Sequence, residues 1–390
     1  MADLFWPGSE RAGDIFTNEA FLAAMVDVEQ AWLEASEPGT DVSLVGLVTA
    51  ADLAALAADA EAGGNPVIGL VGLLRERSGV TAVHRGLTSQ DVVDTALVLC
   101  LREALERIAG DVERQARAIV RHVTTHRASV MAARTLTQWA VPTTFGLKAA
   151  TWLQGLSAAT ERLDRCRPLP AQIGGAAGTL AAPSELAGGS EAALRRAADA
   201  AERLGLAVAS PWHTERSVLT EYADALVALA DVWGRVGGDV ALLSRPEIGE
   251  LREGTGGGSS TMPGKANPVL SVLLRRHGLT APGHAAILHV AAAAYVDERP
   301  DGAWHAEWDA LRTLVRQTVV AASQAADLLE GLVVDTDRMA ARVSEAASTL
   351  TAEQRSMGGA GDDPAAYLGA TDHLITAALE RAALLWKDLA

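Results

Sequence analysis

The residues best suited to chemistry in this sequence form a run of glycine and serine that ends in a lysine. It reads GTGGGSSTMPGKANP over residues 254–268. A phosphate-binding loop also combines glycines with a lysine, because its backbone N–H groups surround an anion that the lysine neutralises. The spacing of that motif fails here, since Ser259 stands at its first glycine and Ala266 replaces its Ser or Thr. A flexible linker has no reason to end in a rigid Pro263 and a lysine, so we expect a mobile loop beside one fixed cation, Lys265.

Three other segments place hydrogen-bond donors next to cationic side chains. They read HRGLTSQDVVDTA (residues 84–96), ARTLTQWAVPTTFG (133–146) and SPWHTERS (210–217). Hydroxyl, amide and guanidinium groups donate hydrogen bonds to carboxylates, and arginine pairs with a carboxylate through two parallel bonds. Together with the glycine-rich loop, these segments predict a site for a small anionic molecule.

Taken together, the four segments resemble the fumarase/aspartase superfamily, an all-α family of lyases with a GSSxMPxKxNP signature loop. Residues 258–268 match each fixed position of that signature. TSQDVVDTA is similar to the adenylosuccinate-lyase and cycloisomerase branch rather than to the fumarase branch. IGGAAGTLA (173–181), PWHTER and ERPDGAWHAEW (298–308) are similar to segments of bacterial 3-carboxy-cis,cis-muconate cycloisomerases. The resemblance spans roughly residues 5 to 335, and a shortened tail follows.

The resemblance implies a proton transfer at the carbon next to a carboxylate, through a dianionic aci-carboxylate. It makes Ser259 the base and gives Ser260 a hydrogen-bonding role beside it. A serine hydroxyl is a weak base at neutral pH and must be activated by its surroundings. We expect the backbone N–H groups of the loop and Lys265 to stabilise an alkoxide and the extra charge on the substrate. The glycines would let the loop close over the substrate and exclude water.

The first polar segment resembles a carboxylate-binding element. The resemblance makes Thr88 and Ser89 donors to a substrate carboxylate, with His84 and Gln90 nearby. The alternative is that Ser89 caps the N-terminus of the following helix. Both readings are compatible, because a helix N-terminus is itself an anion site. A lone histidine such as His84 can equally be structural.

The second polar segment departs from the family pattern. Many relatives have a histidine at one of two positions after Arg-Thr, where this chain has Leu136 and Trp139. Neither side chain transfers a proton in catalysis, since the indole of tryptophan is a donor only. The identity of the general acid therefore stays open. The remaining polar contacts expected from this segment are Arg134, Thr135, Gln138 and Thr144.

His213 is the candidate replacement acid, in a loop where an acidic neighbour favours the protonated ring. The alternative of equal weight is that His213 is a hydrogen-bonding loop residue. Candidate carboxylate clamps are Arg216, Arg275 and Arg299. Arg275 can instead face solvent on the helix after Pro268. In the signature loop, Lys265 and Asn267 complete the expected substrate contacts.

Helices must position these segments. Apolar residues recur at helical spacing in several stretches: 18–34, 91–127, 140–164, 185–204, 217–245, 266–296, 305–334 and 370–388. No strand pattern is convincing, which predicts an all-α fold. We expect a long central bundle of the fumarase/aspartase type at residues 95–335, with the signature loop at 253–268. Smaller helical domains would occupy residues 1–94 and 336–390.

The composition excludes several function classes. A formal net charge of −16 argues against a nucleic-acid partner. The longest uncharged stretch, 277–296, contains histidine, glycine and proline, so we expect no membrane span. Two cysteines without metal-site spacing and the lack of a secretory signal favour the cytoplasm. His122 and His126 have the spacing of zinc ligands, but no third ligand is evident and we expect no metal.

Three functional hypotheses remain. The first is a cofactor-free cycloisomerase that lactonises 3-carboxy-cis,cis-muconate, a small polycarboxylate of aromatic catabolism. The second is another lyase of the adenylosuccinate or argininosuccinate type that releases fumarate. The third is a catalytically silent helical module, which the missing histidine favours and the intact loop opposes. The family resemblance and the long apolar helices also predict a homotetramer.

Overall fold

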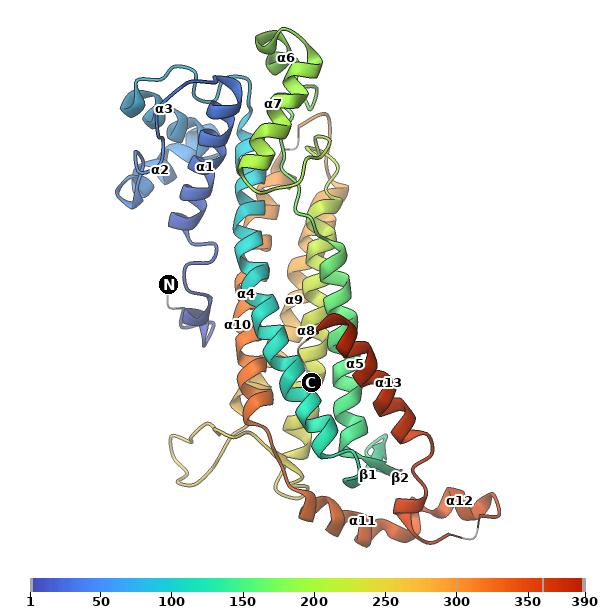
Figure 1. Cartoon of the computed structure of the whole chain (residues 1–390). Helices are drawn as coiled ribbons and strands as arrows, with labels where there is room; N and C mark the ends of the chain where they lie inside the picture. The colour runs from blue at the N-terminus through green and yellow to red at the C-terminus, as the bar shows by residue number, and fades with distance from the viewer. Residues whose placement is uncertain (1–2, 300, 360, 388–390) are drawn as a thin grey trace. The chain divides into compact units, whose positions relative to one another are not determined.

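The computed structural model describes residues 3–299, 301–359 and 361–387 (Figure 1). The chain forms two compact units. Unit 1 consists of Met1–Arg107, Cys166–Asp224 and Gly283–Val319, and unit 2 of Ile108–Arg165, Ala225–Pro282 and Val320–Ala390. Pro300 of the segment 298–308 lies outside the described residues. The three-part division at residues 94 and 335 stays a prediction.

Four long helices contribute residues to both units: α4 (Ser89–Thr125), α8 (Ser217–Leu243), α9 (Val269–Ala293) and α10 (Gly302–Gly331). The shorter helices of unit 1 are η1 (Ser9–Ala12), α1 (Asn18–Ser36), η2 (Ala50–Asp52), α2 (Leu53–Gly63), α3 (Val67–Ser78), α6 (Ala181–Ala187) and α7 (Ser190–Arg203). Those of unit 2 are α5 (Phe145–Arg165), α11 (Thr336–Leu350), α12 (Ala352–Ser356), η3 (Pro364–Ala366) and α13 (Thr371–Leu385). In unit 1, α1 packs on α7, and in unit 2, α13 packs on α5.

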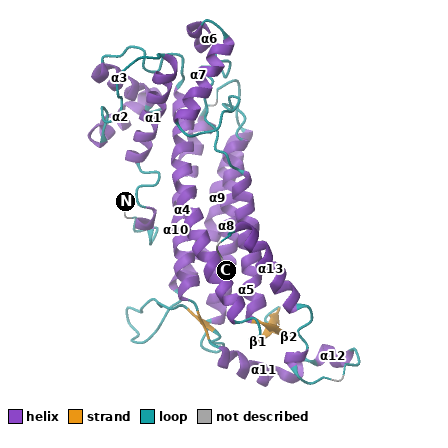
Figure 2. Cartoon of the chain, viewed as in Figure 1, coloured by secondary structure: helices purple, strands orange, loops and turns teal. Residues whose placement is uncertain are grey.

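The predicted all-α class is confirmed, because helices dominate the described residues and the strands there form two short antiparallel pairs (Figure 2). The long helices begin and end within a few residues of the expected stripes, as α4 does at Ser89 and Thr125. The sequence pattern missed α2, α3, α11 and the short α12. In α2 the reason is visible, since Leu56 is its only buried residue and leaves no apolar stripe to detect.

The expectation of no strands is wrong in two places. Strands β1 (Val130–Thr135) and β2 (Gln138–Thr144) form an antiparallel hairpin, and β3 (Leu251–Arg252) pairs with β4 (Val333–Val334). Residues 140–144, which the pattern placed in a helix, are therefore strand. The hairpin turn is Leu136-Thr137, and both residues have positive φ, 47° and 71°. Such turns normally contain Asn-Gly or Asp-Gly, so the sequence lacked the usual signal.

The core of unit 2 contains a polar link between its long helices. Gln115 of α4 is fully buried, donates to the carbonyl of Ala322 on α10 at 2.8 Å, and accepts from the Trp233 indole of α8 at 2.8 Å. A buried amide needs both partners, so this pair of bonds fixes the register of three helices in unit 2.

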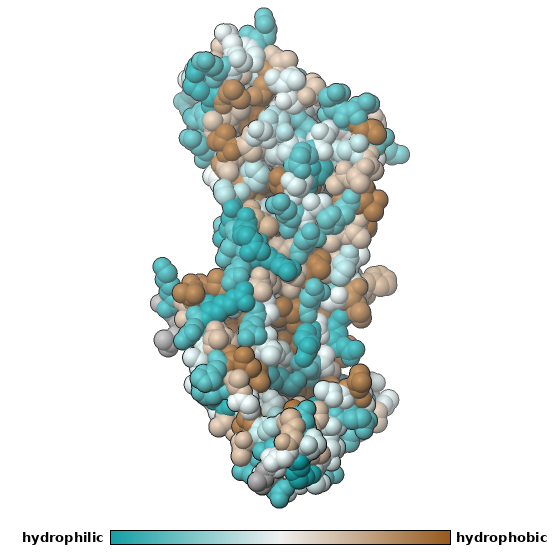
Figure 3. All heavy atoms as spheres, turned by 90° about the vertical axis from the view of Figure 1, so that its right-hand side faces the viewer, coloured by the Kyte–Doolittle hydropathy of each residue, from teal (hydrophilic) through white to brown (hydrophobic). Residues whose placement is uncertain are grey.

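The surface mixes hydrophilic and apolar side chains (Figure 3). No helix in the described part of the chain is long and apolar enough to cross a membrane. Several large apolar residues of α9 are nevertheless exposed, and Leu279 is the most exposed at 81%. Among the described residues, Cys100 and Cys166 form no disulfide, and burial raises the pKa of the Cys100 thiol to about 12.

Candidate active site

A buried carboxylate gathers three of the predicted segments in unit 1. Asp91, in the first turn of α4, is fully buried. Its oxygens accept hydrogen bonds from the backbone N–H groups of Thr88, Gly174 and Gly175 at 2.8–2.9 Å and from the Gln172 amide at 3.1 Å. The His213 ring lies 3.1 Å from the same carboxylate. The segments at 84–96, 173–181 and 210–217 therefore meet at one side chain, which the sequence analysis did not single out.

His213 is buried in this network. Its acidic partner is Asp91, whereas Glu215 bonds to Ser217. Gly174 lies so close to the ring that an added Cβ would stand 2.5 Å from Cε1 of His213. These contacts favour the alternative in which His213 is a hydrogen-bonding loop residue, and its role as an acid stays a prediction.

The predicted carboxylate donors begin α4. Ser89 is the first residue of the helix, so Thr88, not Ser89, takes the N-cap position. The Thr88 N–H donates to Asp91, as in one half of a capping box. Gln90 is fully buried and donates to the carbonyl of His213 and to Asp94. These bonds occupy the Gln90 amide within unit 1. The substrate contacts expected of Thr88, Ser89 and Gln90 stay predictions.

His84 has a partner that the sequence did not reveal. Its Nδ1 lies 2.6 Å from a carboxylate oxygen of Glu29, which is fully buried on α1. His84 has a left-handed backbone with φ of 63°. Arg75 donates to the carbonyl of Val83, the residue before His84, and the Trp32 indole donates to the carbonyl of Arg85, the residue after it. A strained backbone persists only when neighbours fix it in this way, and here they present the ring in one orientation.

Arg216 is not a substrate clamp, contrary to expectation. The residue is buried, and each of its five N–H groups has a partner within the chain. Four bonds go to the carboxylates of Asp94 and Glu307, and the fifth goes to the carbonyl of Trp212. Burial raises the pKa of Glu307, although the Arg216 charge opposes that shift. The guanidinium therefore compensates two buried acids and has no donor left.

The signature loop of unit 2 is closed at its base. Gly257 and Asn267 exchange two backbone hydrogen bonds of 2.8 Å. The Asn267 side chain donates to the carbonyl of Gly258 at 3.1 Å, so it supports the loop itself. Ser260 and Lys265 are exposed on the loop.

The Ser259 hydroxyl oxygen accepts two backbone hydrogen bonds within the signature loop. Its Oγ accepts hydrogen bonds from the backbone N–H groups of Met262 at 3.1 Å and Thr261 at 3.4 Å. Serine often closes a local turn in this way. The same N–H dipoles, fixed before the reaction, would stabilise negative charge on Oγ.

The β1–β2 hairpin carries the second polar segment. Arg134 pairs with the buried Glu250 through bonds of 3.1 and 3.2 Å, and its guanidinium stacks on Trp139 at 4.5 Å. Trp139, at one of the two positions where the family resemblance leads us to expect a histidine, provides the surface on which the Arg134 guanidinium stacks. Leu136, at the other such position, is 95% exposed at the turn.

The other predicted residues of unit 2 divide into two groups. Thr144 is buried and caps α5 by accepting from the Leu147 N–H at 3.1 Å, and its expected substrate contact stays a prediction. Thr135, Gln138 and Arg275 are exposed. In unit 1, Arg299 is also exposed, with its guanidinium 5.9 Å from the Trp304 ring.

Packing explains the arrangement of His122, near the end of α4, and His126, which directly follows the helix. His122 lies 2.9 Å from the carbonyl of Leu329 and stacks on His126 with the ring centroids 6.2 Å apart. In the described ranges, no group of three or more His, Cys, Asp or Glu side chains is arranged to hold a metal ion.

Comparison with known proteins assigns the family. A family model described as a lyase matches residues 55–283 of the chain. The chain belongs to this lyase family. The fumarase/aspartase superfamily expected from the sequence is thereby confirmed, and with it a lyase-type enzyme.

Relatives of the lyase differ in their named substrates. Nitrosuccinate lyase of Streptomyces davaonensis is 42% identical and aligns over 87% of this chain and 76% of its own. 3-Carboxy-cis,cis-muconate cycloisomerase of Pseudomonas aeruginosa is 41% identical over 83% of this chain and 74% of its own. The crystal structure of the 3-carboxy-cis,cis-muconate lactonizing enzyme from Pseudomonas putida superposes with a TM-score of 0.82 at 31% identity. It covers 95% of this chain and 96% of that one.

The assignment of Arg216 to structure predicts a large effect on stability. Replacing Arg216 by Met leaves Asp94 and Glu307 buried without a counter-charge. We expect the free energy of unfolding to fall by about 3–5 kcal/mol in chemical denaturation, because breaking a buried pair is costly. The matched control Arg275→Met removes an exposed guanidinium and should change stability by at most about 0.5 kcal/mol. Equal small losses in both variants would contradict the structural assignment.

Proposed function

We propose that this lyase lactonises 3-carboxy-cis,cis-muconate without a cofactor. The observation that carries the proposal is the stacking of Arg134 on Trp139, at one of the two positions where the family resemblance leads us to expect a histidine. With Leu136 exposed at the other position, the hairpin offers no side chain that protonates a leaving group. Such a site suits a leaving group that departs as a stabilised anion. In the reverse of lactonisation the leaving group is a carboxylate.

The proposed reaction needs one proton donor. A carboxylate of the substrate attacks its own double bond, and negative charge develops at the carbon next to another carboxylate as an aci-carboxylate. The Ser259 hydroxyl gives its proton to this carbon. The resulting alkoxide accepts hydrogen bonds from the backbone N–H groups of Thr261 and Met262. Solvent then restores the hydroxyl. Attack within one molecule benefits from proximity, so correct folding of the diene supplies much of the acceleration.

Cations with exposed side chains support the choice of a polycarboxylate. Lys265, Arg275 and Arg299 are all exposed, in contrast to the enclosed Arg216. Arg134 is already paired with Glu250, so we propose that it acts through its remaining donor capacity. The further proposed contacts are His84, Thr88, Ser89, Gln90, Thr135, Gln138 and Asn267.

Elimination from nitrosuccinate is the second candidate function. The 42% identity to a nitrosuccinate lyase favours it. The same site chemistry suits it as well, because Ser259 would remove a proton next to one carboxylate while nitrite leaves as a stabilised anion. Release of an amine, as from adenylosuccinate, fits less well, since an amine must be protonated as it departs.

A substrate comparison separates these candidates. We expect the purified protein to abolish the ultraviolet absorbance of 3-carboxy-cis,cis-muconate, with no loss of rate after EDTA treatment. Nitrosuccinate should release no nitrite and adenylosuccinate no fumarate. Nitrite release with the diene untouched would replace the first candidate by the second. A folded protein inactive on both substrates would refute the proposed chemistry.

The two adjacent serines give a second test. Ser259→Ala should lower kcat at least about a hundredfold while the circular dichroism spectrum stays unchanged, as is usual for the loss of a general acid or base. Ser260→Ala is the matched control one residue away and should cost much less, because its proposed role is hydrogen bonding. Similar small losses in both would place the proton-transferring group elsewhere.

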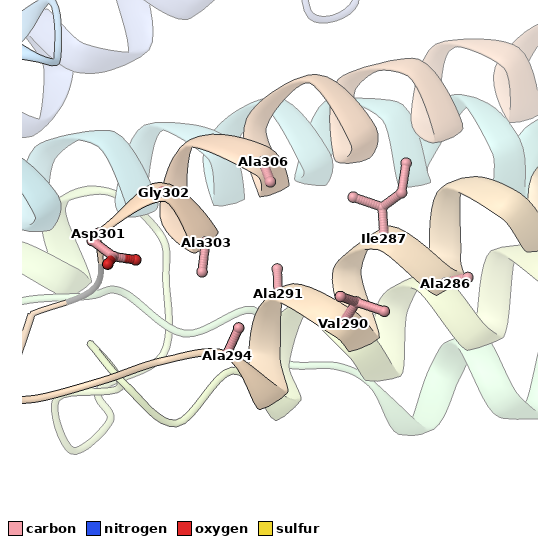
Figure 4. Close-up of a pocket in the computed structure, with 9 residues that line it drawn as sticks. All are labelled: Ala286, Ile287, Val290, Ala291, Ala294, Asp301, Gly302, Ala303 and Ala306. Carbon is pink, nitrogen blue, oxygen red and sulfur yellow. The ribbon is translucent and has the colours of Figure 1, made fainter.

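We also propose a homotetramer whose active sites combine loops from different chains. The exposed apolar residues of α9 support it, among them Val272, Leu279 and Val290. Unit 1 adds an open apolar pocket of about 450 Å³, lined mainly by small side chains of α9 and α10 (Figure 4). Surfaces of this kind usually contact another protein. Light scattering at micromolar concentration should give a tetramer mass, and a uniform monomer would contradict the proposal.

The cytoplasmic location stays a prediction.

A further inference from the structure

Glu253 joins the two ends of the signature loop. It follows strand β3 directly and is 6% exposed. One oxygen accepts from the backbone N–H and the hydroxyl of Ser271, both at 2.7 Å, and the other accepts from the Leu270 N–H at 3.2 Å. These N–H groups belong to the first turn of α9, where a helix leaves its donors unpaired. Glu253 therefore caps α9 from the far end of the loop that precedes it.

The chain before the loop is fixed as firmly as the chain after it. The β3–β4 pairing holds Leu251 and Arg252. Gly254 then packs so closely on the backbone that an added Cβ would lie 2.4 Å from the carbonyl oxygen of Gly331. The loop consequently leaves a rigid strand and enters a rigid helix, and Glu253 bonds one to the other.

The reactive residue lies a short distance along the chain from this link. The two backbone bonds between Gly257 and Asn267 join the two sides of the loop again, and Ser259 lies two residues after Gly257. Among the described residues, the bonds that reach Ser259 beyond this base all lie within the loop. They run from the Asn267 side chain to Gly258 and from Thr261 and Met262 to Oγ, so the base determines where this local unit stands. Glu253 is itself buried and contributes no group to the substrate.

We infer that Glu253 is a positioning residue that sets the place of Ser259 through the first turn of α9. The inference rests on the proposed function, in which Ser259 exchanges the proton of the substrate. A purely structural cap would stabilise α9 and leave turnover unchanged. A positioning residue affects turnover, because small displacements of a reacting group are costly.

Glu253→Gln is the decisive variant. The amide keeps the shape and one acceptor oxygen, but its NH2 group would face the Leu270 N–H, so two donors meet. We expect kcat to fall at least about tenfold and KM to change by less than about twofold, since alignment rather than substrate binding is lost. The matched control is Glu161→Gln, which breaks the two-bond pair of Glu161 with Arg381 in the same unit, away from the loop. Its kcat should equal that of the wild type.

A lysine-specific protease reports on the loop without any substrate. The chain has three lysines, of which Lys148 is half-buried in α5, Lys265 is exposed in the loop and Lys387 follows α13. Cleavage after Lys265 therefore yields two large fragments. We expect Glu253→Gln to be cleaved there at least about five times faster than the wild type, because local opening controls proteolysis. Glu161→Gln should be cleaved at the wild-type rate.

Ser271→Ala tests the same inference if Glu253→Gln fails to fold. It removes the hydroxyl bond to Glu253 and leaves both backbone bonds, so kcat and cleavage should change in the same directions by smaller factors. Wild-type kcat in a folded Glu253→Gln, even with lower stability, would overturn the inference. If the unmodified protein acts on neither proposed substrate, the proposed function fails, and equal cleavage rates at Lys265 would then overturn the inference separately.

Discussion

A buried carboxylate must be given hydrogen-bond donors or a counter-charge, and this requirement organises the lyase at each place where polar segments converge. The cost of an uncompensated acid in a protein interior exceeds that of most other defects. Asp91 collects backbone N–H groups, Glu250 takes Arg134, and Glu253 takes the first turn of α9. Each acid draws together segments far apart in the sequence. The loops that carry the proposed site residues are therefore held by buried acids.

The same requirement divides the cations of the protein into two populations. With 49 acidic and 33 basic residues, the chain has few positive charges to spare. The Arg216 guanidinium is buried and paired with two buried acids, whereas Lys265 on the signature loop is exposed. The sequence near an arginine does not show which population it belongs to. The acid that pairs with it can lie many residues away, as Glu307 does from Arg216.

This separation explains how far the sequence could predict the structure. Long helices were found because apolar periodicity is a local signal, and the signature loop because its residues are contiguous. The hairpin was missed since Leu136-Thr137 carries no glycine or asparagine to mark its turn. The contacts of Glu29 with His84 and of Asp91 with Gly174 join residues 55 and 83 positions apart, so no local pattern contains them.

The stacking of Arg134 on Trp139 has a consequence for how such enzymes diverge. The indole fills one of the two positions where the family resemblance leads us to expect a histidine, and it provides the surface on which the guanidinium stacks. A histidine at position 139 would add a ring that can transfer a proton and at the same time remove that indole surface. A substitution at this one position therefore changes the placement of Arg134 together with the proton chemistry of the hairpin.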